Sequence, residues 1–116
     1  MSTDGFIESA VRAAGDFAGF FEHDGGTGYF YLYETEGEAG KKVLGSVHVC
    51  SGPIDFGGSD VAVRWDLEDR RVGVFIRGVL WAAFDCQDGS HYGGDYAPGA
   101  TPSLPQEIEL SFRHAS

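Results

Sequence analysis

The residues of this 116-residue sequence best suited to chemistry are four polar side chains beside aromatic positions: Glu22, Asp24, His48 and Asp85. Carboxylates next to an imidazole can bind a divalent metal or exchange protons, provided that the fold brings them within reach of one another. In the alternative interpretation, Asp24 accepts hydrogen bonds from the backbone of its own turn. Glu22 and Asp85 would then face water, and His48 would bond to a neighbouring group. Spacing along the chain does not decide between these interpretations.

The sequence contains no motif of an established catalytic or cofactor site. H-E-x-x-H, C-x-x-C, the phosphate-binding loop and G-x-S-x-G are all missing from it. Cys50 and Cys86 lie far apart, each at the end of an apolar run, which favours two small buried thiols over a redox or metal pair. We therefore assign no catalytic residue, no metal ligand and no cofactor.

Three tyrosines occupy every second position of one segment: Tyr29, Tyr31 and Tyr33. In a strand their rings would form a stripe on one face, with Phe30 and Leu32 on the other. A covering segment, such as the loop that carries Tyr92 and Tyr96, would make the stripe part of the core. An exposed stripe would instead suit a protein interface, because the ring is apolar and the hydroxyl remains hydrated. The candidate binding residues are Glu22, Asp24, Tyr29, Tyr31, Tyr33, His48, Asp85 and Tyr92.

These candidates depend on a β-hairpin at residues 20–34, FFEHDGGTGYFYLYE. Strands are predicted at residues 17–22 and 29–34, where aromatic residues recur at alternate positions. The glycine-rich stretch between them supplies residues that tolerate positive φ in a turn. The charged segment 35–42, TEGEAGKK, is predicted to be an exposed connection.

Alternation of apolar and polar residues continues after the hairpin. It predicts a strand at 43–50, a loop at 51–60, and then a meander of three strands at 61–66, 72–76 and 80–84. In the last of these, Leu80, Ala82 and Phe84 are expected on the inner face, with Trp81 and Ala83 opposite.

The two ends of the chain give weaker patterns. Residues 6–11 suit either a short helix or a strand, and we favour the strand because the next strand follows at once. Residues 88–105 are rich in Gly and Pro and are predicted to be a long loop. Residues 107–113 alternate charged and apolar side chains, which predicts a final half-buried strand.

Together these elements predict one all-β domain spanning residues 1–116. About eight antiparallel strands with short connections indicate a sandwich or a partly open barrel, with a short N-terminal helix as the variant. A chain of this length, with 42% hydrophobic residues, can bury a core without metals or disulfides.

The chain has 18 acidic and 8 basic residues, a formal net charge of -10. This charge disfavours nucleic acid and favours a basic protein partner, although it also serves solubility. The N-terminus lacks the pattern of a secretory signal and no run reaches membrane-spanning length, so we expect a cytoplasmic protein without a membrane partner. Nothing in the sequence indicates the oligomeric state.

The hairpin segment 21–31, FEHDGGTGYFY, resembles the F-E-D-D-G-E-T-G-Y-F-Y signature of a bacterial domain family of unknown function. The resemblance extends over about residues 17–98, through LGSVHV at 44–49, VRW at 63–65, IRG at 76–78 and AFD at 83–85. His23 and Gly26 replace two acids of the signature, which argues against a cation site at this turn. The resemblance implies no activity.

The leading hypothesis is a non-enzymatic binding or protein-interaction domain with an acidic, aromatic surface near the hairpin. A small acidic domain that neutralises a basic toxin fits the size and charge. The alternatives are a ligand-binding barrel covered by the late loop and a small metal-dependent enzyme that uses the four polar residues named first.

Overall fold

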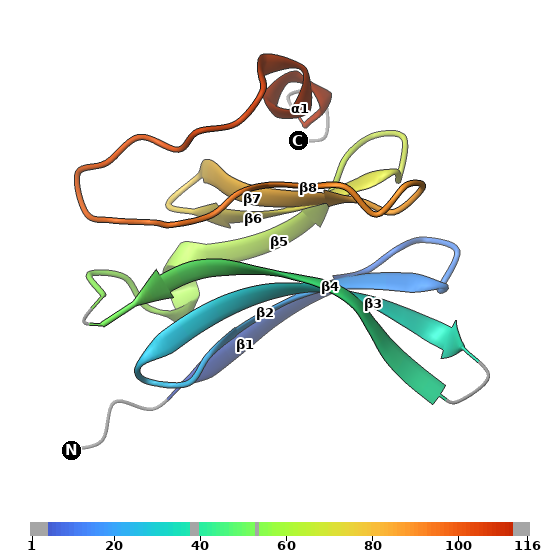
Figure 1. Cartoon of the computed structure of the whole chain (residues 1–116), viewed down its shortest axis with the longest axis horizontal. Helices are drawn as coiled ribbons and strands as arrows, with labels where there is room; N and C mark the ends of the chain where they lie inside the picture. The colour runs from blue at the N-terminus through green and yellow to red at the C-terminus, as the bar shows by residue number, and fades with distance from the viewer. Residues whose placement is uncertain (1–4, 38–39, 53, 113–116) are drawn as a thin grey trace.

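The computed structural model describes residues 5–37, 40–52 and 54–112. The described chain forms two four-stranded antiparallel sheets that face each other (Figure 1). The first sheet contains, in order, β1 (Phe6–Val11), β2 (Phe17–His23), β3 (Thr27–Gly37) and β4 (Gly40–Ser51). The second contains β5 (Val61–Trp65), β6 (Arg71–Ile76), β7 (Val79–Asp85) and β8 (His91–Gly93), preceded by the 3-10 turn η1 (Gly58–Asp60) and followed by the helix α1 (Gln106–Ser111). This is the expected sandwich, without a closed barrel.

The main core lies between the two sheets. Phe21 and Phe30 of the first sheet and Phe84 of the second sheet are completely buried. The Phe84 ring lies 5.4 Å from the Phe30 ring. Gly19 lies at this interface, where an added Cβ would come within 2.4 Å of Val72, so the sheets approach closely only because a side chain is missing there.

Hydrogen bonds to backbone carbonyls join the sheets at both margins. On one side, the Trp65 indole of β5 donates a 2.9 Å hydrogen bond to the carbonyl of Ala10 in β1. On the other, the amide of Asp95, just after β8, donates to the carbonyl of His48 in β4 at 3.1 Å. Both β1 and β4 are therefore partly covered as edge strands, which limits unwanted strand pairing.

Several predicted elements are confirmed. Residues 6–11 form a strand, the hairpin pairs β2 with β3, and the meander is β5, β6 and β7 in sequence. The predicted loop at 88–105 is correct for most of its length, but it contains the short strand β8. The prediction that segment 35–42 is only a connection was wrong.

In that segment β3 continues to Gly37 and β4 begins at Gly40, and these two glycines are paired. A charged sequence is compatible with this pairing, because the hydrogen bonds of a ladder use the backbone alone. Residues 38 and 39, also part of the predicted connection, lie outside the described residues.

The final strand predicted at 107–113 was also wrong, because residues 106–111 form α1. Ile108 and Phe112 are both buried and are four residues apart, which places them on one face of a helix. Residues four apart also share a face of a strand, which repeats every two residues, so the alternation could not separate the two structures. Pro105 precedes the helix and supplies a fixed φ that suits its start. Arg113 lies outside the described residues.

A β-bulge changes which residues of β7 point inward. Phe75 pairs with Leu80 and Val74 pairs with Ala82, so Trp81 is the extra residue between them. As a result Trp81 joins the core between the sheets, whereas Leu80 packs on the outer face. The expectation that Leu80 faces inward and Trp81 outward was therefore wrong.

Within the described ranges, no helix is both long enough and apolar enough to cross a lipid bilayer.

Both cysteines are free thiols: Cys50 is buried and Cys86 is half-buried. Burial raises the pKa of each thiol.

Candidate functional site

The outer face of the first sheet is built from three rows of cross-strand neighbours. Directly paired residues of an antiparallel sheet project on the same face, so the register of β1 to β4 defines each row. The rows are Ile7, Glu22, Tyr29 and His48; Ser9, Phe20, Tyr31 and Ser46; and Val11, Ala18, Tyr33 and Val43. We call the surface formed by these positions the tyrosine face.

Aromatic rings run along the middle of this surface. The Phe20 ring is 5.3 Å from the Tyr33 ring in an edge-to-face arrangement and 6.2 Å from the Tyr31 ring. Tyr29 stacks near Tyr31 at 6.1 Å and meets the His48 imidazole at 5.5 Å. Such contacts hold the rings in defined positions on a rigid sheet, which reduces the entropy that a partner would have to remove.

The tyrosine face is not covered by another element of the described chain. In Figure 1 it is the lower surface of the first sheet, and none of the drawn helices or strands lies beneath it. Tyr29 is 38% exposed, Ile7 54% and Val11 60%. The alternative that a loop buries the stripe does not hold, because Tyr92 packs against the hydrophobic cluster around Phe75 and Leu80 on the second sheet.

The charge of this surface is one-sided. None of the positions in the three rows holds Lys or Arg, whereas Glu22 supplies an exposed carboxylate next to Tyr29. Burial, followed by the negative charge of Glu22, raises the pKa of Tyr31. The phenol therefore stays neutral over the physiological range and can donate a hydrogen bond.

Asp24 acts within its own turn. Its Oδ1 accepts hydrogen bonds from the amides of Gly26 at 2.9 Å and Thr27 at 2.7 Å, and these bonds lower its pKa. The neighbouring His23 points into the core, where its ring stacks on Phe6 at 5.5 Å. The alternative of a backbone-bonded turn is therefore confirmed for Asp24, and the role of this side chain is structural.

His48 and Asp85 lie on different sheets. The Nδ1 of His48 is 3.1 Å from the carboxylate of Asp95, which is 88% exposed, at the rim of the tyrosine face. Asp85 is on β7 and is buried. The structure thus brings Glu22 and His48 to one surface but separates them from Asp85, and in the described chain no three acidic, His or Cys side chains gather as a metal site would require.

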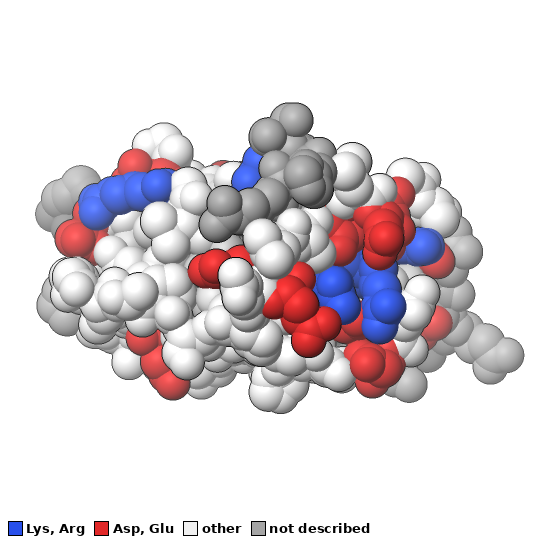
Figure 2. Space-filling view, turned by 90° about the horizontal axis from the view of Figure 1, so that it is seen from above, with Lys and Arg blue, Asp and Glu red and all other residues white. Residues whose placement is uncertain are grey.

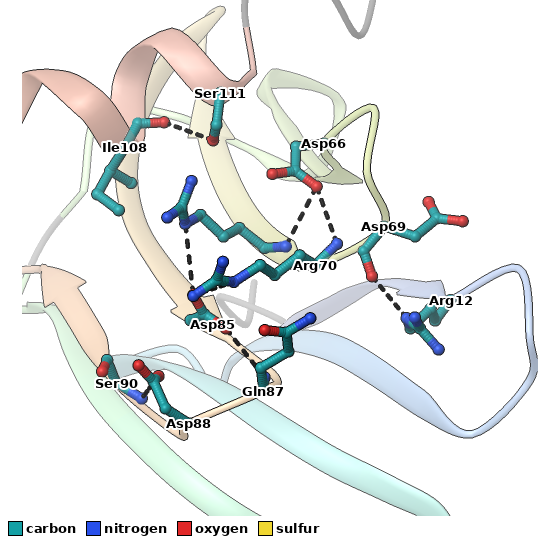
Figure 3. Close-up of polar contacts among 11 residues, drawn as sticks. Arg12, Asp66, Asp69, Arg70, Asp85, Gln87, Asp88, Ser90, Ile108 and Ser111 are labelled. Carbon is teal, nitrogen blue, oxygen red and sulfur yellow. Dashed lines mark hydrogen bonds and ion pairs between the residues drawn. The ribbon is translucent and has the colours of Figure 1, made fainter.

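Asp85 belongs instead to a partly buried ion-pair cluster at the margin of the second sheet (Figure 3). Its Oδ2 accepts a 2.7 Å hydrogen bond from Nε of Arg70 and lies 3.5 Å from Nε of Arg71, and its Oδ1 accepts the amide of Gln87 at 2.9 Å. Asp85 raises the pKa of Arg70. Nearby, Oδ1 of Asp66 accepts the amides of Arg70 at 2.9 Å and Arg71 at 3.2 Å.

Sequence reasoning missed this cluster. It predicted only a short connection between the strands at 61–66 and 72–76, and Asp85 facing water was one of its two interpretations. One local signal was available, since an aspartate that opens a turn often accepts the backbone amides that follow it. The pairing of the arginines with Asp85 was not visible, because it depends on the register of β6 against β7.

Comparison with known proteins places this architecture in a family. A family model described as an uncharacterized protein conserved in bacteria (DUF2251) matches residues 1–106, which include both sheets. The chain belongs to this family. The resemblance seen in the hairpin and the later strands is thereby confirmed at the level of a bacterial domain of unknown function. The match ends where α1 begins, so most of this helix in the present DUF2251 protein lies beyond the matched residues.

No curated protein and no solved structure matches the DUF2251 chain. The family description names no activity, so a function has to be argued from the surfaces of this molecule.

Proposed function

We propose that this chain is a non-enzymatic protein-interaction domain whose tyrosine face binds a basic surface of a partner protein. The observation that carries the proposal is the uncovered outer face of the first sheet, where aromatic rings stand among positions that hold no Lys or Arg. Tyr rings are enriched at interface centres because they combine a large apolar area with a hydroxyl that tolerates water.

The charge of the chain supports a basic partner. A net charge of -10 draws cationic surfaces toward the molecule and repels anionic ones, including nucleic acid. This steering acts over a Debye length of about 8 Å at physiological salt. The exposed Glu22 and the rim residue Asp95 would then lie beside the aromatic contacts, where charge sets the association rate and orientation more than the affinity.

We also propose that the interaction takes place in the cytoplasm. The two cysteines are free, and one of them, Cys50, is buried in the main core. Proteins of oxidising compartments more often join such residues into disulfides.

A site-specific crosslink would test the proposal. A photoreactive amino acid at Ser46, which is exposed and directly paired with Tyr31, would be compared with one at Val79 on the second sheet. The expected result is that a basic protein is captured from the Ser46 position and not from Val79. The contacted peptide of that protein should carry Lys or Arg, and the affinity of the purified pair should fall as salt rises.

Two charge-matched variants complete this test. Glu22→Gln and Glu68→Gln each remove one exposed carboxylate, but only Glu22 lies on the tyrosine face. We expect Glu22→Gln to slow association more than Glu68→Gln does. Equal effects, an acidic partner, or affinity that ignores salt would contradict the proposal.

A further inference from the structure

A cavity of about 430 Å³ lies between α1 and the turn that joins β5 to β6. Its walls include Asp66, Glu68 and Arg71 from the sheet side, and Glu107 and Ser111 from α1. We call this cavity the α1 pocket. Its volume falls within the range of small-molecule sites, about 300–1,000 Å³. Figure 2, seen from the side of α1, shows basic side chains bordered closely by acidic ones on this surface.

Asp66 brings an unsatisfied acceptor to the α1 pocket. The residue is only 3% exposed, and its Oδ1 is occupied by the backbone amides of Arg70 and Arg71. Its Oδ2 is buried and has no hydrogen-bond partner in the described chain. In Figure 3 this second oxygen turns away from the amides and toward the side where Ser111 lies. A buried carboxylate oxygen without a donor is unfavourable, so a ligand that donates to it would gain that interaction.

Arg71 brings an incompletely used cation to the same cavity. Its side chain is 16% exposed, and its Nε has no hydrogen-bond partner among the described residues. The nearest carboxylate oxygen, Oδ2 of Asp85, is 3.5 Å away and already accepts the 2.7 Å bond from Arg70. The planar guanidinium of arginine is well suited to a carboxylate ligand, which it can hold with two parallel hydrogen bonds.

The two groups do not satisfy each other. Asp66 forms no ion pair in the described chain, and Arg71 pairs only loosely with Asp85. A ligand that complements the α1 pocket therefore needs a cationic donor for Asp66 and an anionic acceptor for Arg71. Glu68 and Glu107 add negative charge to the walls, which favours a ligand that carries an ammonium group and disfavours a simple anion.

From this juxtaposition we propose that the α1 pocket binds a free α-amino acid, with its ammonium group on Asp66 and its carboxylate on Arg71. Glu107 on α1 supplies a second acceptor near the ammonium group. The side chain of the ligand extends along Leu67 and Leu110, which give the pocket its apolar wall. This proposal is independent of the tyrosine face, which is on the outer surface of the other sheet.

The test is a titration of the full-length chain with the common L-amino acids, followed by thermal unfolding and by amide chemical shifts in NMR. We expect at least one amino acid to raise the melting temperature saturably with a Kd of about 1 mM or tighter. The amide signals of Arg70, Arg71 and Ser111 should shift, whereas that of Tyr31 should not. The N-acetyl derivative, which lacks the ammonium charge, and the decarboxylated amine, which lacks the carboxylate, separate the two halves of recognition, and each should bind at least about tenfold more weakly.

Two glutamates on α1 provide a matched pair of variants. Glu107 borders the α1 pocket, whereas Glu109 borders a separate depression with Arg64 on the other flank of the helix. Glu107→Gln should weaken binding and Glu109→Gln should leave it unchanged. Arg71→Lys, which keeps the charge but loses the planar guanidinium, should weaken binding of the amino acid while leaving that of the decarboxylated amine unchanged.

The NMR measurement needs no variant, so a folding defect in a substituted chain would not prevent a decision. The proposal is overturned if no amino acid shifts the signals near the α1 pocket at about 10 mM. It is also overturned if the decarboxylated amine binds as tightly as the amino acid, or if Glu109→Gln weakens binding as much as Glu107→Gln.

Discussion

The two sheets of this sandwich bury their inner faces against each other, but only the second sheet has its outer face covered by another segment of the described chain. On the second sheet, Phe75, Leu80 and Ala83 are covered by Ile108 and Phe112 at the end of the chain, and all five are buried. On the first sheet, the tyrosine face carries the rings of Phe20, Tyr29, Tyr31 and Tyr33 but has no covering segment in the described chain. Both faces contain large apolar side chains, so residue type alone does not distinguish core from surface.

The difference lies in the polar atoms that accompany the rings. The buried side chains of the covered face are Phe, Leu and Ala, which have no hydrogen-bonding groups to satisfy when α1 packs on them, and Tyr92 beside them is only partly buried. The uncovered face uses Tyr rings, whose hydroxyls can remain in water, and places Ser, Glu and His among them. A sheet face that combines rigid rings with hydrated polar groups is suited to reversible contact with a partner.

The largest expected effect concerns the covered face. Phe75 is 6% exposed and its ring lies 5.4 Å from that of Phe112. Phe75→Ala should lower the free energy of unfolding by about 3–5 kcal/mol, because it removes buried area and leaves a cavity. Phe20→Ala, the counterpart on the tyrosine face, should cost about 1 kcal/mol. Urea denaturation measures both, and equal losses would show that the tyrosine face is buried after all.

Replacing one carboxylate on each sheet compares how much each contributes to stability. Asp85→Ala leaves Arg70 and Arg71 without their shared partner beneath the surface, and should cost about 3 kcal/mol. Glu22→Ala on the exposed face should change stability by no more than about 0.5 kcal/mol. Thermal and urea unfolding of the two variants give this difference directly. A small loss for Asp85→Ala would mean that water replaces the ion pairs easily.

A charge introduced on the tyrosine face should affect binding and not folding. Ser46 is exposed and is paired with Tyr31 in the middle row. Ser46→Arg should leave stability within about 0.5 kcal/mol of the parent and weaken binding of a basic partner at least about tenfold by like-charge repulsion. Ser46→Glu, which places a side chain of opposite charge at the same position, is the control and should retain binding. Calorimetric titration with the crosslinked partner measures both, and a stronger complex with Ser46→Arg would exclude a basic partner surface.

The smallest effect is a titration at high pH. Because the folded chain raises the pKa of Tyr31 above its ordinary value of 10.0, the folded state holds that proton after the unfolded chain has lost it. Stability from this group is therefore complete below the ordinary pKa and declines as the pH rises beyond it. Absorbance of the phenolate should show late-titrating tyrosines, and Tyr31→Phe should remove one of them while Tyr96, whose pKa burial also raises, remains. An unchanged titration curve would show that partial burial does not affect this ring.

Much of this organisation could be predicted from local pattern. The alternation of Tyr29, Phe30 and Tyr31 placed hydroxyl-bearing and plain rings on opposite faces of one strand, because a strand repeats every two residues. The acidic glycine-rich stretch after His23 indicated the turn, and the structure confirms that Asp24 bonds to its backbone. These features depend only on neighbours in sequence, so the sequence by itself determined them.

Other features depended on contacts between distant segments. The extra residue Trp81 reversed the expected inward set of β7, since a bulge is decided by how two strands meet. The spacing of Ile108 and Phe112 fitted a strand and a helix equally, and packing on the second sheet selected the helix. Arg70 and Arg71 met Asp85 only through the pairing of β6 with β7. The tertiary structure likewise determined which outer face is covered, because this depends on where the later segment that contains α1 packs.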